Sequence, residues 1–138
     1  NTDSTIKGQT IFLAERAAEL MNKNIITDRT VIDVMAFTSL AKSISIIDSD
    51  SFEDYASRLL EEYDYIFYVS PEGVEIEDNG VRETDTEYRE LVDFSINKFL
   101  DRYNHRIKNL VKLKGTTDER IKAFKEAILP QYLYQNTW

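Results

Sequence analysis

Two adjacent residues of opposite charge, Asp28 and Arg29, follow a short apolar run at Ile25 and Ile26. A carboxylate at the end of a strand can accept the proton of a substrate hydroxyl or hold a magnesium-bound water. A neighbouring guanidinium can donate paired hydrogen bonds to phosphate oxygens. The same aspartate could instead be the N-cap of the next helix, with Arg29 on the surface. The pair is therefore typical of either a phosphoryl-transfer site or an ordinary helix start.

A second group of charged residues belongs to the polar segment 71–84, whose length is typical of a lid or a binding loop. Arg82 stands among acidic residues there, and Arg89 follows near the start of the next predicted helix. A mobile loop could bring such an arginine onto a phosphoryl group in transfer and stabilise the charge that develops. The arginine could equally do no more than balance the neighbouring carboxylates.

The third group is the turn GTTDER, residues 115–120. Gly115 lets the backbone turn closely after a predicted strand, and exposed amide groups there could contact the edge of a purine. Thr116 and Glu119 also have the spacing of a capping box, so an ordinary strand-to-helix turn is the other interpretation.

The composition excludes several classes of function. The chain of 138 residues carries 25 Asp and Glu against 17 Lys and Arg, a net charge of −8. This balance argues against general nucleic-acid binding but leaves room for a local pocket for one small phosphate ligand. The absence of cysteine and the single His105 argue against a zinc site and a Ser-His-Asp triad. No run approaches the ~20 apolar residues of a membrane span, and we expect a cytoplasmic protein without membrane contact.

Apolar spacing and capping signals predict five helices. They are expected at 9–22, at 30–43, from a capping box at 50–53 to about 62, from 84 to about 103, and from the cap at 116 to Pro130. Aromatic and β-branched residues predict strands at 25–27, 63–69 and 106–113.

This alternation of helices and strands predicts one α/β domain, residues 1–138, with a parallel sheet. Its three parts would be a core with the Asp-Arg pair (8–62), a strand with the lid and long helix (63–103), and a last strand and helix (104–138). Each predicted strand ends in a polar group, and ligands of such sheets bind beyond the carboxyl ends of the strands. We therefore expect the three polar ends to form one site.

The order of these features resembles the P-loop nucleoside and nucleotide kinases. The likeness is greatest to the ATPase/kinase branch that includes the nicotinamide riboside kinase domains of bacterial NAD-biosynthesis regulators. It covers about residues 9–129 and rests on these features: Gln9 and Arg16 on one helix, TDR at 27–29, the strand YDYIFYVSP, the loop EDNGVRETDTEYRE and the segment VKLKGTTDER. The resemblance implies a three-layer αβα P-loop kinase-like fold, ATP and Mg²⁺ as cofactors, and a nucleotide and a small-molecule acceptor as partners.

The resemblance also implies roles for the candidate residues. Asp28 would be the catalytic base or the ligand of a magnesium-bound water, and Arg29 would bind the phosphate or the acceptor. Arg82 and Arg89 would cover the donor phosphates. The residues near the base of the donor nucleotide would be Gly115, Thr116, Thr117 and Arg120.

The sequence departs from this family because it contains no Gly-x-x-x-x-Gly-Lys-Ser/Thr loop, which cradles the phosphates. Gly8 alone precedes residue 73, and it lacks the required spacing. We expect the first strand and this loop to precede Asn1 in a longer protein, which would be an ATP-dependent kinase. The alternatives are an ATPase module that drives a change in a partner, and a non-catalytic interaction domain; each is compatible with an oligomer or a protein partner.

Overall fold

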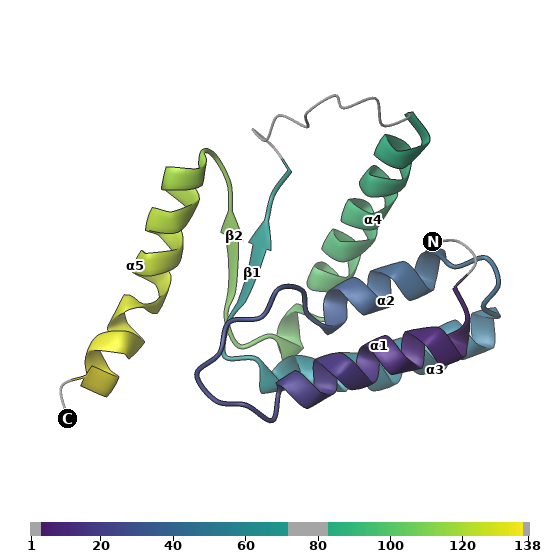
Figure 1. The fold of residues 1–138 in the computed structure, drawn as a ribbon, viewed down its shortest axis with the longest axis horizontal. Coiled ribbons are helices and arrows are strands. Elements are labelled where there is room, and N and C mark those ends of the chain that lie inside the picture. Colours follow the sequence, from purple (N-terminus) through teal and green to yellow (C-terminus); the bar gives the residue numbers. More distant parts are fainter. Residues whose placement is uncertain (1–3, 72–82, 137–138) are drawn as a thin grey trace. The chain divides into compact units, whose positions relative to one another are not determined.

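The structure, a computed structural model, describes residues 4–71 and 83–136, which form five α-helices, two 3₁₀ turns and a two-stranded parallel sheet (Figure 1). These residues divide into two compact units. We call residues 4–64 and 83–108 the helical unit, and residues 65–71 and 109–136 the sheet unit. The predicted α/β class with parallel strands is confirmed.

The helical unit is built around its second helix. Its elements are α1 (Ile6–Glu19), α2 (Val31–Leu40), α3 (Ile46–Arg58), η1 (Leu59–Glu62), α4 (Glu83–Arg102) and η2 (Asn104–Arg106). The sequence of α2, VIDVMAFTSL, is apolar on nearly all sides, and such a helix is stable only when other helices surround it. Helix α2 accordingly packs against α1, α3 and α4.

The core of the helical unit lies where these helices meet α2. Its fully buried apolar side chains include Val31, Met35, Leu60, Phe99 and Leu100. A polar pair is enclosed as well, because the Gln9 amide nitrogen donates to the Thr38 hydroxyl at 2.9 Å. Buried polar groups are costly unless they are hydrogen-bonded, and this pair satisfies that requirement between α1 and α2.

Charged side chains connect α3 to the end of α4. Glu53 accepts a hydrogen bond from Arg102 at 2.8 Å and another from the Tyr103 hydroxyl. Arg106 donates to the hydroxyl of Ser57 at 2.7 Å. Burial and the bond to Glu53 raise the pKa of Tyr103. These contacts fix the carboxyl end of the long helix α4 against α3.

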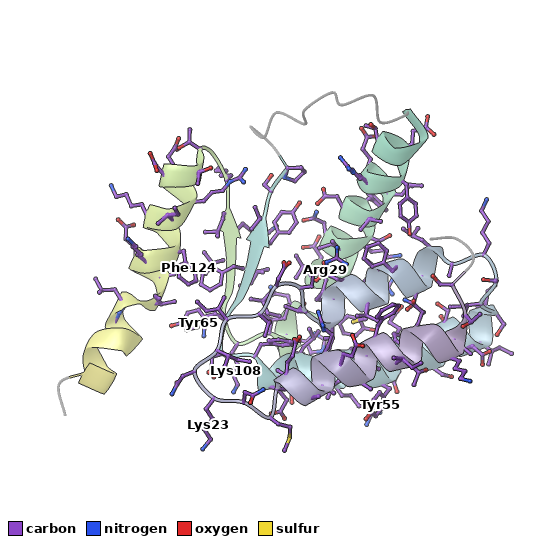
Figure 2. All side chains as sticks on the ribbon, in the orientation of Figure 1. Lys23, Arg29, Tyr55, Tyr65, Lys108 and Phe124 are labelled. Carbon is purple, nitrogen blue, oxygen red and sulfur yellow. The ribbon has the colours of Figure 1, made fainter. Side chains whose placement is uncertain are left out.

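The sheet unit consists of β1 (Ile66–Val69), β2 (Leu110–Leu113) and α5 (Thr117–Asn136). The strands are parallel, with Ile66 opposite Leu110 and Val69 opposite Leu113. Helix α5 packs on β2 and places Phe124 against Phe67, with 4.7 Å between the ring centroids. Tyr65 stacks on the same Phe67 at 5.8 Å; Figure 2 labels Tyr65 and Phe124. Aromatic contacts therefore connect β1 to α5 within this unit.

All three predicted strands differ from the structure. The strand predicted at 63–69 is shorter, since η1 precedes it and β1 begins at Ile66. Residues 25–27 form no strand, because Ile25 and Ile26 are exposed and no neighbouring strand pairs with them among the described residues. β-branched residues favour strands when they pack on a sheet surface, and here they do not. The strand predicted at 106–113 is shorter, since η2 precedes it and β2 begins at Leu110.

Several predicted helix boundaries were also wrong. The helix predicted at 9–22 is Ile6–Glu19, and the helix predicted at 30–43 ends at Leu40. The capping box predicted at Asp50 lies inside α3, which begins at Ile46 and is capped by the Ser45 hydroxyl, 3.1 Å from the backbone N–H of Asp48. Helix α5 continues through Pro130 to Asn136. A proline removes one backbone hydrogen bond but keeps a φ close to the helical value, so the helix can continue past it. No helix in the described ranges combines the length and the apolar character that crossing a membrane requires.

Candidate functional site

Asp28 and Arg29 lie in a turn between α1 and α2, and both residues are exposed. The backbone of Arg29 has a φ of 73°, in the left-handed region that side-chain-bearing residues rarely adopt. That conformation costs about 1–2 kcal/mol, and it persists only where the surroundings impose it. Figure 2 shows Arg29 on this turn, ahead of α2.

Three contacts hold the Asp28–Arg29 turn. Arg16 of α1 donates from Nη1 to the carbonyl of Asp28 at 3.3 Å. The Thr27 hydroxyl donates to the carbonyl of Arg29 at 3.2 Å. The guanidinium carbon of Arg29 lies 5.8 Å from the centre of the Phe37 ring on α2. The turn is therefore attached to two helices, while the Asp28 carboxylate remains exposed.

Asp28 is not the cap of α2, so its N-cap interpretation was wrong. Thr30 caps this helix: its hydroxyl accepts from the backbone N–H of Ile32 at 3.1 Å, and its own N–H donates to Asp33 Oδ2 at 2.8 Å. Burial raises the pKa of Asp33, against the lowering effects of the Thr30 bond and of Arg29. The spacing of Thr30 and Asp33 is that of a capping box, so this cap was readable in the sequence.

An aromatic pair lies beside the Asp28–Arg29 turn. The rings of Phe37 and Tyr88 are 6.4 Å apart and inclined by 31°, which brings α2 and α4 together. Burial raises the pKa of Tyr88. Arg89, predicted to cover the donor phosphates, follows Tyr88 on α4 and is exposed. The contact between Phe37 and Arg29 was not predicted, because no local sequence pattern indicates it.

The polar ends of β1 and β2 meet in the sheet unit. The backbone N–H of Ser70 donates to the carbonyl of Leu113 at 2.9 Å, and Arg120 donates to the carbonyl of Ser70 at 3.1 Å. Arg120 therefore joins the first turn of α5 to the end of β1. Two of the three predicted polar strand ends lie side by side as expected.

The turn before α5 has the geometry of a capping box. Gly115 has a φ of +94°, which favours glycine. The Thr116 hydroxyl accepts from the N–H of Glu119 at 3.2 Å, and Thr116 N–H is 3.4 Å from Glu119 Oε1. The structural interpretation of this turn is confirmed. Thr116 and Thr117 are exposed, and their contact with a nucleotide stays a prediction.

The candidate residues fall into two groups by unit. Asp28, Arg29 and Arg89 belong to the helical unit, while Gly115 to Thr117 and Arg120 belong to the sheet unit. Arg82 lies outside the described residues, together with most of the predicted lid.

Magnesium was predicted at Asp28. In the ranges 4–71 and 83–136, no three acidic or histidine side chains group closely enough to form an all-protein metal cage. A nucleotide-bound Mg²⁺ does not require one, because it retains waters and is held by one or two carboxylates together with substrate phosphates. The exposed carboxylate of Asp28 fits that mode of binding.

The comparison with protein families matches a model described as an AAA domain over residues 5–120. That range contains every candidate residue discussed above. No curated protein and no solved structure gives a significant match to the chain.

Proposed function

The chain belongs to the AAA domain family, whose members are P-loop NTPase-like, and we propose that it serves ATP-dependent phosphoryl transfer to a nucleoside, nucleotide or similar small acceptor. The observation that carries this proposal is the Asp28–Arg29 turn. An arginine in a left-handed conformation is held there between two helices, beside an exposed carboxylate with no capping role. Strained residues of this kind concentrate at binding and catalytic sites.

Asp28 and Arg29 would have different roles in the transfer. The acceptor hydroxyl attacks the terminal phosphorus of ATP, a new oxygen–phosphorus bond forms, and the bond to ADP breaks. Asp28 orients the hydroxyl and takes its proton, while Arg29 donates hydrogen bonds to phosphate oxygens. Positioning and charge stabilisation supply most of the catalysis in such reactions.

The donor would be held by other residues of the chain. Arg82 and Arg89 would neutralise the donor phosphates, and Gly115, Thr116, Thr117 and Arg120 would lie near the base. Bound Mg²⁺ would supply charge neutralisation between the phosphates, with Asp28 holding one of its waters. The sequence contains no Gly-x-x-x-x-Gly-Lys-Ser/Thr motif for the phosphates themselves.

The test measures ADP production from Mg·ATP with and without a panel of nucleosides and nucleotides, in the longest natural form of the protein that carries this chain. A kinase produces ADP only when an acceptor is present. Asp28→Ala should lower kcat by roughly 10²–10⁴-fold without changing the melting temperature, because it removes a general base. The control is Asp101→Ala, which removes an exposed carboxylate of α4. Equal activity of the two variants would overturn the proposal.

Family membership also favours a second function, an ATPase that changes the conformation of a partner protein. This function predicts ADP production without any acceptor, at a rate that the partner alters. A third alternative, a non-catalytic interaction domain, predicts no thermal shift with Mg·ATP. ADP production with and without an acceptor separates the first two functions, and the thermal shift with Mg·ATP identifies the third.

A further inference from the structure

The contact between Arg29 and Phe37 joins a strained turn to a rigid helix. The guanidinium carbon is 5.8 Å from the ring centre, within the range at which a cation is attracted to the face of an aromatic ring. Arg29 is exposed, and its guanidinium makes no hydrogen bond or ion pair within the described part of the chain. Its N–H donors are therefore available to a ligand.

Phe37 occupies a distinct position on α2. Its neighbours Ala36 and Thr38 are buried, whereas Phe37 is only half-buried. The Arg29 guanidinium lies over its ring, and the centre of the Tyr88 ring of α4 is 6.4 Å from the centre of the Phe37 ring. The ring is thus held by two packed helices, and it presents a fixed aromatic face to a side chain on a turn.

We propose that Phe37 is a positioning residue for Arg29, fixing the guanidinium so that it binds a phosphate group, and that Tyr88 holds the ring in place. This inference rests on the proposed function and adds the residues that prepare its phosphate-binding arginine. A free arginine loses much rotamer freedom when it binds an anion. A guanidinium already restrained by a ring loses less, and binding is tighter for that reason.

The experiment follows the Arg29 Nε–Hε resonance by NMR while inorganic pyrophosphate is added. In the free protein, the ring of Phe37 should shift the side-chain protons of Arg29 upfield, and Phe37→Leu should abolish that shift. Phe37→Leu should also weaken pyrophosphate binding roughly 3- to 10-fold, whereas Phe37→Tyr, which keeps an aromatic face, should stay within about 2-fold of the wild type. Tyr88→Leu should also weaken pyrophosphate binding and should leave the helical structure of α2 unchanged.

The control is Tyr55→Leu, which removes an aromatic ring from an exposed position on α3, labelled in Figure 2. It should change neither the Arg29 resonance nor the affinity. If Phe37→Leu does not fold, Phe37→Met and Tyr88→Leu give the same readout.

The outcomes separate this inference from the function on which it rests. If Arg29→Ala abolishes binding but Phe37→Leu matches the wild type, the positioning role is overturned and the role of Arg29 stands. If Arg29→Ala leaves the affinity unchanged, both assignments fail. Absence of pyrophosphate binding by the wild type also overturns the inference. In the Arg29→Ala background, Phe37→Leu should have no further effect.

Discussion

The phenol oxygen of Tyr63 accepts a hydrogen bond from the backbone N–H of Val31, and the two atoms are 3.2 Å apart. Val31 is the first residue of α2 and is fully buried, so its N–H has neither a partner within the helix nor water. Tyr63, 32 residues further along the chain, supplies the missing acceptor. This contact connects the end of η1 to the start of the central helix.

Replacement of Tyr63 by phenylalanine should lower the free energy of unfolding by about 1–3 kcal/mol, because it leaves a buried N–H unsatisfied. Urea unfolding followed by circular dichroism measures this change. Tyr55→Phe removes a hydroxyl from an exposed position of α3 and serves as the matched control, with a change near zero. Equal stability of the two variants would contradict the contact.

Stability should also fall at alkaline pH because of Tyr63. Burial raises the pKa of this phenol to about 12, whereas tyrosine in an unfolded chain titrates near 10. Between these values the unfolded state has lost the proton that the folded state keeps, so stability decreases as pH rises. The advantage of the wild type over Tyr63→Phe should therefore shrink between pH 10 and 12. A constant difference over that interval would show that the phenol is not shielded.

The pair formed by Gln9 and Thr38 provides a double-mutant test. Thr38→Val removes the acceptor of the 2.9 Å bond and leaves the buried Gln9 amide without it, at a cost of about 1–3 kcal/mol. Adding Gln9→Leu removes the unpaired group and should recover part of the loss. Urea unfolding of the two single variants and the double variant gives the coupling energy. Strictly additive effects would mean that the two side chains do not depend on each other.

Sequence patterns of a few residues predicted helices and helix caps, which depend on residues close together in the chain. Thr116 and Glu119 are three residues apart, and the cap they form before α5 was predicted from that spacing. The cap formed by Thr30 and Asp33 has the same pattern but was overlooked in favour of Asp28. Most helices were located from apolar spacing. Their ends were predicted less accurately, because more than one nearby residue has the type of an N-cap, as Ser45 and Asp50 do in α3.

Contacts between distant residues could not be predicted in this way. Tyr63 reaches Val31, and Arg29 reaches Phe37, only once α2 has packed into the unit. Neither pair has a characteristic spacing in the sequence. The apolar pair at residues 25 and 26 suggested a strand, yet a strand requires a partner that a single segment does not reveal. Asp28 and Arg29 were expected at the end of a strand, whereas they lie in a turn of the helical unit whose backbone strain no sequence pattern indicated.

Gly115 should not tolerate alanine. Its φ of +94° is unfavourable for any residue with a Cβ atom, and that atom would lie 2.8 Å from Glu119 Oε2. Gly115→Ala should therefore destabilise the protein by about 1–2 kcal/mol or more, measured by thermal unfolding. In a Glu119→Ala background the steric clash is absent, so adding Gly115→Ala there should cost only the backbone strain, measured against Glu119→Ala alone. An unchanged melting temperature for Gly115→Ala would rule out this backbone conformation.

Arg16 should control the rigidity of the Asp28–Arg29 turn. Its Nη2 atom is 3.0 Å from Glu19 Oε1, and its Nη1 donates to the carbonyl of Asp28. The ion pair within α1 therefore orients the guanidinium toward the turn. Arg16→Met keeps an apolar stem but removes both interactions. Backbone amides of the turn should then exchange with deuterium several-fold faster, because local opening no longer breaks the bond to Arg16.

Glu19→Gln is the control that retains the arginine, and its exchange rates should lie between those of the wild type and Arg16→Met. If Arg16→Met leaves the exchange unchanged, the strained turn is held by Thr27 and Phe37 alone.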